Sequence, residues 1–260
     1  MKIGVFDSGL GGLSVLHCAQ KLIPNADYVY YADEKHVPYG EKKPEELKGF
    51  IKEIIQFMID KNVDAIVIAC NTATSMIDKS ERKKYPIPIV GMEPAVKKAV
   101  DLYSNENKRI LVAATPVTIT GDKLKGLVEQ VDRDNMTDLV ALPGLVRYAE
   151  QGDFSSDGII TYLKEALKEY DLSNYGTVVL GCTHFNYFKP SFQKLFDQEV
   201  HFLDGNEGTI HQLLRVLPNK LEKKEKGTVE YYFSGDKLTE KEHSFVQQCL
   251  SQLDVVYSIN

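Results

Sequence analysis

The chain has 260 residues, of which 43% are hydrophobic and 26% are charged, and its formal net charge at pH 7 is −6. That length suits one large α/β domain or two domains of ordinary size, and the acidic balance argues against a nucleic-acid-binding surface. No run of about 18 apolar residues is present, and glycines follow the first strand too early for a signal peptide. We therefore expect a cytoplasmic protein with neither a membrane nor a nucleic acid among its partners.

Strands and helices alternate through the first part of the chain. The apolar run from Ile3 to Phe6 predicts a buried strand, and Asp7-Ser8-Gly9 forms the turn at its carboxyl end. Residues 26–32 are a second strand candidate, and the apolar side chains over 44–61 recur at three and four residues, which predicts a helix. VDAIVIACNTATS then repeats the order of strand, turn and helix start. This alternation predicts βαβ units and a mainly parallel sheet.

The same order restarts near residue 109. RILVAATPVTI and GTVVLGCTHFNYF are expected to be strands with polar turns at their carboxyl ends, and helical stretches lie around 121–130 and 157–170. The segment HFLDGNEGTIHQLLRVL predicts a helix, and GTVEYYFSGD predicts a late strand. We expect the tail to return to the first half, giving one α/β domain of residues 1–97 plus 207–260 and a second of residues 98–206.

An internal repeat relates the two halves. AIVIACNT (65–72) aligns with TVVLGCTH (177–184), and KIGVFDSG (2–9) aligns more weakly with RILVAATP (109–116). Duplication is the simpler interpretation, although any two buried parallel strands look alike. We therefore expect an α/β fold with two pseudo-symmetric halves, each a mainly parallel sheet flanked by helices, and an active site in the cleft between them.

The chain contains four cysteines, and they have different surroundings. None lies in a C-x2-C arrangement, so neither a structural zinc site nor another metal site is expected. Cys18 and Cys249 lie on helical stretches among apolar neighbours, where a free cysteine is commonly a small buried hydrophobe. Cys70 and Cys182 each end a buried strand and are followed at once by hydrogen-bonding side chains, which makes them candidates for chemistry.

Polar groups also follow the other strands of the predicted sheets. Ligands of open α/β sheets bind at the carboxyl ends of the strands. The polar strand ends are Asp7-Ser8, Cys70-Asn71-Thr72, Thr115 to Thr118 and Cys182-Thr183-His184. The nearby GLGG turn does not fit G-x-G-x-x-G because position 14 is Ser, so we expect no nucleotide cofactor.

Structural explanations exist for several of these residues. Asp7 could serve only as a helix cap, and His184 could be an ordinary half-buried histidine. Tyr39-Gly40 could be merely a turn, and Glu150 has the sequence context of an exposed helical carboxylate.

Two strand-end thiols suit one kind of proton transfer. To invert an amino acid, a base must remove the α-proton from one face while an acid delivers a proton to the other face. A thiolate and a thiol can fill these roles and exchange them with direction. The helix-start surroundings of Cys70 and Cys182 are expected to lower their thiol pKa values. No arginine lies in the strand-end motifs, so neutral donors are expected to bind the substrate's carboxylates.

Motifs along most of the chain resemble the glutamate racemase family of the aspartate/glutamate racemase superfamily. The matching segments are FDSGLGGLSV (6–15), VPYG (37–40), ACNTAT (69–74), GCTHF (181–185) and, more weakly, SGD (234–236). The resemblance implies cofactor-independent interconversion of L- and D-glutamate, which supplies D-glutamate for peptidoglycan, and a homodimer.

The resemblance also implies roles for individual residues. Cys70 and Cys182 would be the two bases, Asp7 would assist Cys70, His184 would assist Cys182, and Glu150 would be a further catalytic carboxylate. The implied substrate-binding residues are Asp7, Ser8, Tyr39, Gly40, Asn71, Thr72, Thr118, Thr183 and His184. After GCTH the chain reads Phe185-Asn186-Tyr187-Phe188 where the family usually has an aromatic followed by Pro-Leu-Leu.

Three alternatives to glutamate racemisation stay open. A racemase of a related acid such as aspartate would differ in the pocket for the side-chain carboxylate. A binding protein on the same scaffold would leave the retention of both cysteines unexplained. A cysteine hydrolase would need one nucleophilic thiol with a histidine, and the second strand-end cysteine would have no role.

Overall fold

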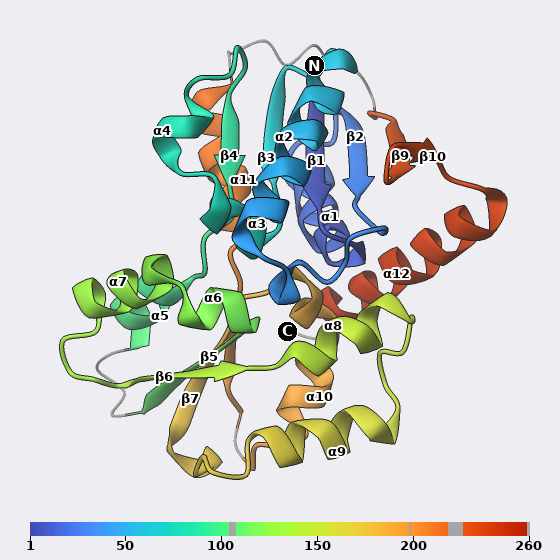
Figure 1. The fold of residues 1–260 in the computed structure, drawn as a ribbon. Helices are drawn as coiled ribbons and strands as arrows, with labels where there is room; N and C mark the ends of the chain where they lie inside the picture. Colours follow the sequence, from blue (N-terminus) through green and yellow to red (C-terminus); the bar gives the residue numbers. More distant parts are fainter. Residues whose placement is uncertain (104–107, 198, 218–225, 259–260) are drawn as a thin grey trace.

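Two mainly parallel sheets form the centres of two lobes in the computed structural model (Figure 1), which describes residues 1–103, 108–197, 199–217 and 226–258. One sheet has the strand order β10-β9-β2-β1-β3-β4 and the other β6-β5-β7-β8. Helices flank both sheets, so the predicted fold class is confirmed. Within the described ranges the β9–β10 pair is antiparallel and the remaining strand pairs are parallel.

The strands are short, as is usual for α/β proteins. The first sheet contains β1 (Lys2–Asp7), β2 (Asp27–Ala32), β3 (Ala65–Ile68), β4 (Ile89–Gly91), β9 (Val229–Phe233) and β10 (Asp236–Lys237). The second contains β5 (Arg109–Ala114), β6 (Thr137–Ala141), β7 (Tyr175–Leu180) and β8 (His201–Leu203).

The helices connect successive strands and cover the sheets. Those of the first lobe are α1 (Leu13–Leu22), α2 (Pro44–Asp60), α3 (Asn71–Met76), α4 (Lys79–Arg82), α11 (Asn206–Val216) and α12 (Glu240–Ser258). Those of the second are α5 (Val96–Tyr103), α6 (Pro116–Thr120), α7 (Asp122–Val131), α8 (Pro143–Glu150), α9 (Asp157–Ala166) and α10 (Lys189–Gln193). Short 3-10 helices are η1 (Leu10–Gly12), η2 (Tyr39–Glu41), η4 (Leu172–Asn174) and η5 (Thr183–Phe188).

The strand orders of the two sheets reveal the internal repeat. The run β2-β1-β3-β4 in one sheet has the same order as β6-β5-β7-β8 in the other. Phe6 pairs with Ile68, two residues before Cys70, and Ala113 pairs with Leu180, two residues before Cys182. The two cysteines therefore occupy equivalent places in the two sheets, in agreement with the pseudo-symmetry expected from the sequence.

The tail of the chain returns to the first lobe. β9 extends the first sheet by pairing in parallel with β2, and α12 packs against both α1 and η5. The expected return of the tail is thus present, whereas the division into domains at 97/98 and 206/207 stays a prediction.

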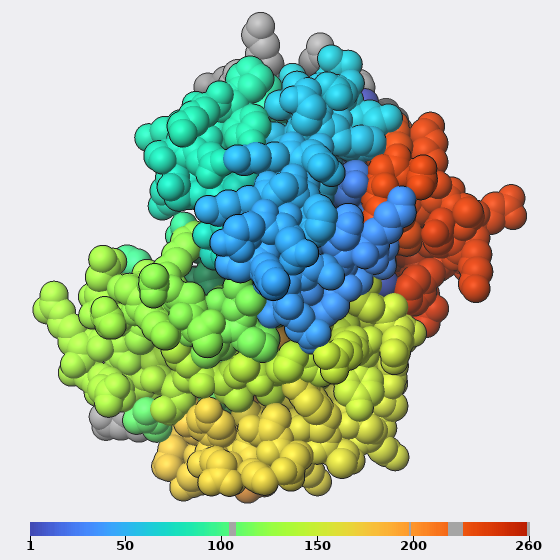
Figure 2. Space-filling view, viewed as in Figure 1, coloured from blue at the N-terminus to red at the C-terminus, as the bar shows by residue number. Residues whose placement is uncertain are grey.

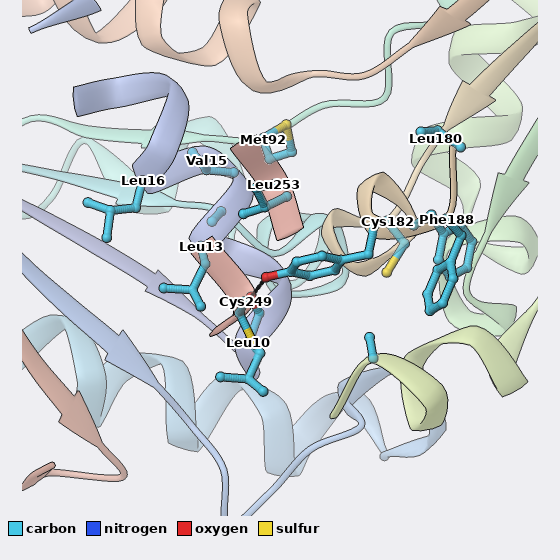
Figure 3. Close-up of a cluster of buried hydrophobic side chains, with 14 of the residues drawn as sticks. Leu10, Leu13, Val15, Leu16, Met92, Leu180, Cys182, Phe188, Cys249 and Leu253 are labelled. Carbon is cyan, nitrogen blue, oxygen red and sulfur yellow. Dashed lines mark hydrogen bonds between the residues drawn. The ribbon is translucent and has the colours of Figure 1, made fainter. Parts of the chain in front are cut away.

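A continuous apolar core joins the lobes on one side. Alternate residues of β1 face opposite layers: Ile3 and Val5 belong to this core, and Phe6 belongs to a separate cluster under α2. The shared core includes Leu10 of the first lobe, Phe188 of the second and Leu253 of α12. Figure 3 shows these side chains as members of one buried apolar cluster. Burial of these side chains stabilises the contact between the lobes.

The region after Val200 differs from the sequence-based expectation. A helix was expected over residues 201–217, but the structure has the three-residue strand β8 followed by α11 from Asn206. Phe202 of β8 pairs with Val178 at the edge of the second sheet. A three-residue edge strand is too short to produce a recognisable alternating pattern, which is why the sequence did not reveal it.

Candidate active site

A small cavity lies between the two lobes at the carboxyl ends of their strands. Its volume is about 20 Å³, which is room for about one water molecule. The lining residues that the sequence predicted are Ser8, Tyr39, Gly40, Cys70, Asn71, Thr72, Cys182, Thr183 and His184. Pro38, Thr115, Val146 and Gly181 complete the lining. Both strand-end cysteines therefore face one space. Figure 2 shows the two lobes touching along a seam on the surface.

Cys70 occupies the position before α3, where the chain leaves β3. Its Sγ accepts a hydrogen bond from the backbone N–H of Ala73 at 3.4 Å and donates one to the Ser8 hydroxyl at 3.7 Å. Burial and the nearby Asp7 carboxylate raise the pKa of the Cys70 thiol, and the Ala73 N–H only partly offsets this. The expectation that helix-start surroundings lower this pKa is therefore wrong for Cys70, because removal of the thiolate from water costs more than one N–H returns.

Cys182 has a different set of partners. Its Sγ lies 3.6 Å from Nδ1 of His184, and Nε2 of the same ring forms a short hydrogen bond with Oε1 of Glu150. Burial opposes the charged imidazolium, but the Glu150 carboxylate and Cys182 raise the pKa of His184 well above its usual range. Cys182, His184 and Glu150 thus form a chain of groups that can pass a proton.

Glu150 is held in place from the opposite lobe. It ends α8, its side chain is largely buried, and its Oε1 also accepts the backbone N–H of Leu10 at 2.9 Å. The exposed helical carboxylate considered from sequence is therefore not what the structure contains.

Asp7 is fully buried at the end of β1. Its Oδ2 accepts hydrogen bonds from the backbone N–H of Gly12 at 2.6 Å and from the Thr183 hydroxyl at 3.1 Å. Its Oδ1 has no hydrogen-bond partner among the described residues. Burial raises the pKa of Asp7. An assisting role toward Cys70 stays a prediction, since the bonds of Asp7 run to the glycine turn and to the second lobe.

Three threonine hydroxyls form a cluster beside Cys70. Thr72 lies 3.1 Å from Thr115 and 3.4 Å from Thr118, and Thr115 lies 3.0 Å from Thr118, each measured between Oγ1 atoms. Thr118 therefore supports the lining instead of forming it. The sequence placed Thr115 at a polar strand end without assigning it to the site, and Val146 was missed because an apolar residue on a helix carries no chemical signal.

Side chains of the second lobe pack closely against the glycine turn after β1. A Cβ on Gly9 would lie 2.1 Å from Oε1 of Glu150, and one on Gly11 would lie 2.5 Å from Oγ1 of Thr183. Only a residue without a side chain permits this approach. The glycines of this turn therefore permit close contact between the lobes.

The aromatic residues after His184, where the chain departs from the family pattern, are buried behind the cavity. The Tyr187 hydroxyl donates to the Leu10 carbonyl at 3.0 Å, and the Phe154 and Tyr187 rings stack with centroids 4.6 Å apart. The departing residues therefore lie in the packing between the lobes and not in the lining of the cavity.

A larger cavity lies elsewhere on the molecule. Its volume is about 1100 Å³, and its lining comes from residues 79–98 and 204–216, none of them shared with the small cavity. Size alone therefore does not identify the candidate active site; the thiols and their hydrogen-bonding neighbours do. In the described part of the chain, no group of three His, Cys, Asp or Glu side chains is placed to hold a metal ion, and no helix is long and apolar enough to cross a membrane.

The sequence matches the family model described as Asp/Glu/Hydantoin racemase over residues 14–213. The chain belongs to this racemase family. A glutamate racemase of Lachnospira eligens is 47% identical over 260 residues, covering 98% of this chain and 98% of that protein.

Solved structures of the racemase family share the fold. The glutamate racemase of Campylobacter jejuni superposes with a TM-score of 0.80 at 27% identity, covering 98% of this chain and 99% of that one. The glutamate racemase of Francisella tularensis in complex with D-glutamate gives a TM-score of 0.80 at 28% identity, covering 96% and 93%. Racemase chemistry requires a proton donor and a proton acceptor, and the small cavity contains two thiols that can supply both.

Proposed function

We propose that this protein interconverts L- and D-glutamate without a cofactor, with Cys70 and Cys182 as the acid/base pair. The observation that carries the proposal is the pair of thiols on equivalent strands of the two sheets, both lining one cavity. The choice of glutamate is supported by the similarity to glutamate racemases over nearly the whole chain.

Inversion at Cα follows from having two groups with opposite protonation. The thiolate removes the α-proton from one face of the bound amino acid, and the thiol on the other face delivers a proton to the planar carbanion. The reverse reaction exchanges the roles. His184 can hold a proton beside Cys182, and the Ser8 hydroxyl and Ala73 N–H can stabilise Cys70 as a thiolate.

Unpartnered acceptors in and behind the cavity fit the substrate's ammonium group. Oδ1 of Asp7 and Oδ1 of Asn71 are both buried and have no hydrogen-bond partner among the described residues. An ammonium carries N–H donors that both oxygens need. We assign these two residues to the ammonium. For the carboxylates we propose the hydroxyls and backbone groups of the lining residues Ser8, Tyr39, Gly40, Thr72 and Thr183. Thr118 supports Thr72 from behind the lining, and His184 keeps its two ring nitrogens on Cys182 and Glu150.

The cavity must enlarge before it can admit glutamate. Its volume of about 20 Å³ is far below the roughly 300–1,000 Å³ of ordinary ligand pockets. The cavity walls come from both lobes, so separation of the lobes is the direct way to enlarge it. Closure around the substrate then excludes water from the thiols.

The biological role that we propose is the supply of D-glutamate for peptidoglycan in the cytoplasm. We also propose a homodimer, to be tested by light scattering of the purified protein. A monomeric mass at all concentrations used in the assay would contradict it.

The function is tested by incubating the purified protein with L-glutamate, D-glutamate and L-aspartate in separate reactions without added cofactor. Optical rotation or chiral chromatography should show loss of either glutamate enantiomer to the racemic mixture, with aspartate unchanged. Turnover of aspartate but not glutamate would support the alternative substrate, and turnover of neither would reject racemisation of acidic amino acids.

A further inference from the structure

Glu34, in the loop after β2, contributes a second carboxyl group behind the proposed proton chain of Cys182. It was not among the residues selected from sequence, because it lies between Asp33 and Lys35 in a polar loop. Its Oε1 is buried and lacks a hydrogen-bond partner in the part of the chain that the structure describes, and so does Oε2 of Glu150. The other oxygen of Glu150 already binds His184 and the Leu10 N–H. The Glu34 and Glu150 carboxyl groups lie within hydrogen-bonding reach of each other, and each has one buried oxygen that lacks a donor.

One proton between the two carboxyl groups would satisfy both oxygens. Two ionised carboxylates cannot lie side by side in a buried site without strong repulsion, so such a pair keeps a proton. Burial, together with the adjacent Glu150 carboxylate, raises the pKa of Glu34 to about 8. At neutral pH the Glu34 carboxyl is then an O–H donor, and Glu150 is the acceptor.

In the described part of the chain, the titratable groups found to act on the Glu34 carboxyl include one possible cation. The titratable groups that act on it or respond to it come from five elements of the fold. They are Glu150 of α8, His184 of η5, Asp7 of β1, Tyr30 of β2 and Cys249 of α12. Among them His184 alone can carry a positive charge, and it is hydrogen-bonded to Glu150.

We propose that Glu34 shares a proton with Glu150 and thereby positions Glu150 against His184 and Cys182. With the proton in place, Oε2 of Glu150 is satisfied and Oε1 stays on the imidazole. When Glu34 ionises, the two carboxylates repel each other, and Glu150 moves away from His184. Glu34 is thus a positioning residue, and its kinetic effect rests on the proposed racemisation, whereas the shared proton itself does not.

Three variants of the full chain separate this role from a merely structural one. Glu34→Gln keeps the size of the side chain and provides an amide N–H donor to Glu150 at every pH. Glu34→Leu removes the donor. Glu45→Gln, at an exposed glutamate on α2, is the matched control. Thermal unfolding of each variant checks that it is folded.

The first measurement is an NMR titration of ¹³C-labelled glutamate carboxyl groups in the substrate-free protein, with the Glu34 signal assigned by its loss in Glu34→Gln. The Glu34 carboxyl should titrate near pH 8. A midpoint near the ordinary value of about 4.3 would overturn the proposal. This result does not depend on whether glutamate is the substrate.

The second measurement is the pH profile of kcat/KM for glutamate. Wild type and Glu45→Gln should lose activity as the pH rises through about 8, and Glu34→Gln should move that alkaline limb to higher pH. Glu34→Leu should lower kcat/KM at pH 7 roughly tenfold, the effect of one lost hydrogen bond to a charged group, while Glu34→Gln stays within about twofold. An unchanged alkaline limb in Glu34→Gln would overturn the positioning role. If no variant racemises glutamate but the Glu34 carboxyl titrates near pH 8, the proposed function fails and the shared proton stands.

Discussion

The hydroxyl of Thr183 donates a hydrogen bond to Oδ2 of Asp7 at 3.1 Å, from the turn after Cys182 in one lobe to the first strand of the other. A reciprocal contact joins Thr72, in α3 directly after Cys70, to Thr115, the residue after β5, also at 3.1 Å. Each cysteine turn is therefore bonded to the opposite lobe. The hydrogen bonds that position the two cysteine turns are therefore also contacts that hold the two lobes together.

Thr183→Val should weaken the bond between the lobes while keeping the shape of the side chain. Asp7 then keeps only the Gly12 N–H on Oδ2, and a lost hydrogen bond to a charged group should lower kcat/KM for glutamate roughly tenfold or more. Steady-state kinetics measures this. Thr161→Val is the control, because the exposed Thr161 hydroxyl bonds only within α9. Equal activity of the two variants would show that the Thr183 contact does not matter.

Gly11→Ala should disturb the site at a position without any catalytic group. The added Cβ would lie 2.5 Å from Oγ1 of Thr183 and 2.6 Å from the backbone nitrogen of His184, so the backbone of the second lobe must shift. We expect at least a tenfold fall in kcat/KM, since displaced catalytic groups lose activity steeply. Gly49→Ala is the control: nothing lies within 4 Å of its Cβ on α2, and it should stabilise the protein by about 0.5–1 kcal/mol in urea unfolding. Normal kinetics in Gly11→Ala would contradict the close packing of Gly11 against Thr183 and His184.

Glu150→Gln should change how stability depends on pH. The pKa of His184 is raised in the folded protein, so its protonation stabilises the fold fully below the unfolded value of about 6.5, and this contribution is lost as the pH rises through the folded pKa. Without the carboxylate, the charge that does most to raise the pKa of His184 is gone while burial still opposes the imidazolium, so this pKa should fall. The difference in unfolding free energy between wild type and Glu150→Gln should therefore be largest at acidic pH and shrink toward alkaline pH.

Urea unfolding across pH 5 to 9 measures that difference. Glu165→Gln serves as the control, because its carboxylate makes an exposed ion pair with Lys168, worth little at any pH. A difference for Glu150→Gln that grows with pH would mean that His184 does not carry the proton.

Cys70→Ser and Cys182→Ser should each lower racemisation by about 10²–10⁴-fold, because a serine hydroxyl is too weak an acid to replace either thiol. Two enantiomers in water have equal free energies, so kcat/KM must fall by the same factor in both directions. Cys18→Ser, at a partly buried cysteine on α1 outside the cavity, should keep near-normal rates. Near-normal rates in either strand-end variant would contradict the assignment of both thiols.

Much of the fold could be predicted from the sequence, and for physical reasons. Strands of parallel sheets are buried on both faces, so β1, β2 and β3 appear as short apolar runs. Polar side chains follow several of these runs directly, at the carboxyl ends of the strands where ligands of α/β sheets bind, which is how Cys70 and Cys182 and their neighbours could be selected. The repeat of strand and cysteine then predicted the equivalent placement of the two thiols that the sheet registers show.

The remaining parts of the site depend on packing between the lobes, which no local pattern encodes. Glu34 and Glu150 are far apart in sequence, and each has the context of a solvated carboxylate. Cys70 begins a helix, which favours a thiolate, but the extent of its burial depends on residues of both lobes and decides the direction of its pKa shift. The size of the closed cavity is likewise a property of the assembled lobes.

The two-thiol mechanism is tested most directly by racemisation of L-glutamate in D2O, stopped early and analysed by mass spectrometry of the separated enantiomers. Distinct donor and acceptor groups on opposite faces predict that the D-glutamate formed carries deuterium at Cα, while the recovered L-glutamate keeps its proton. A single base serving both faces would return the original proton to the product or label substrate and product together, and either result would contradict the acid/base pair of Cys70 and Cys182.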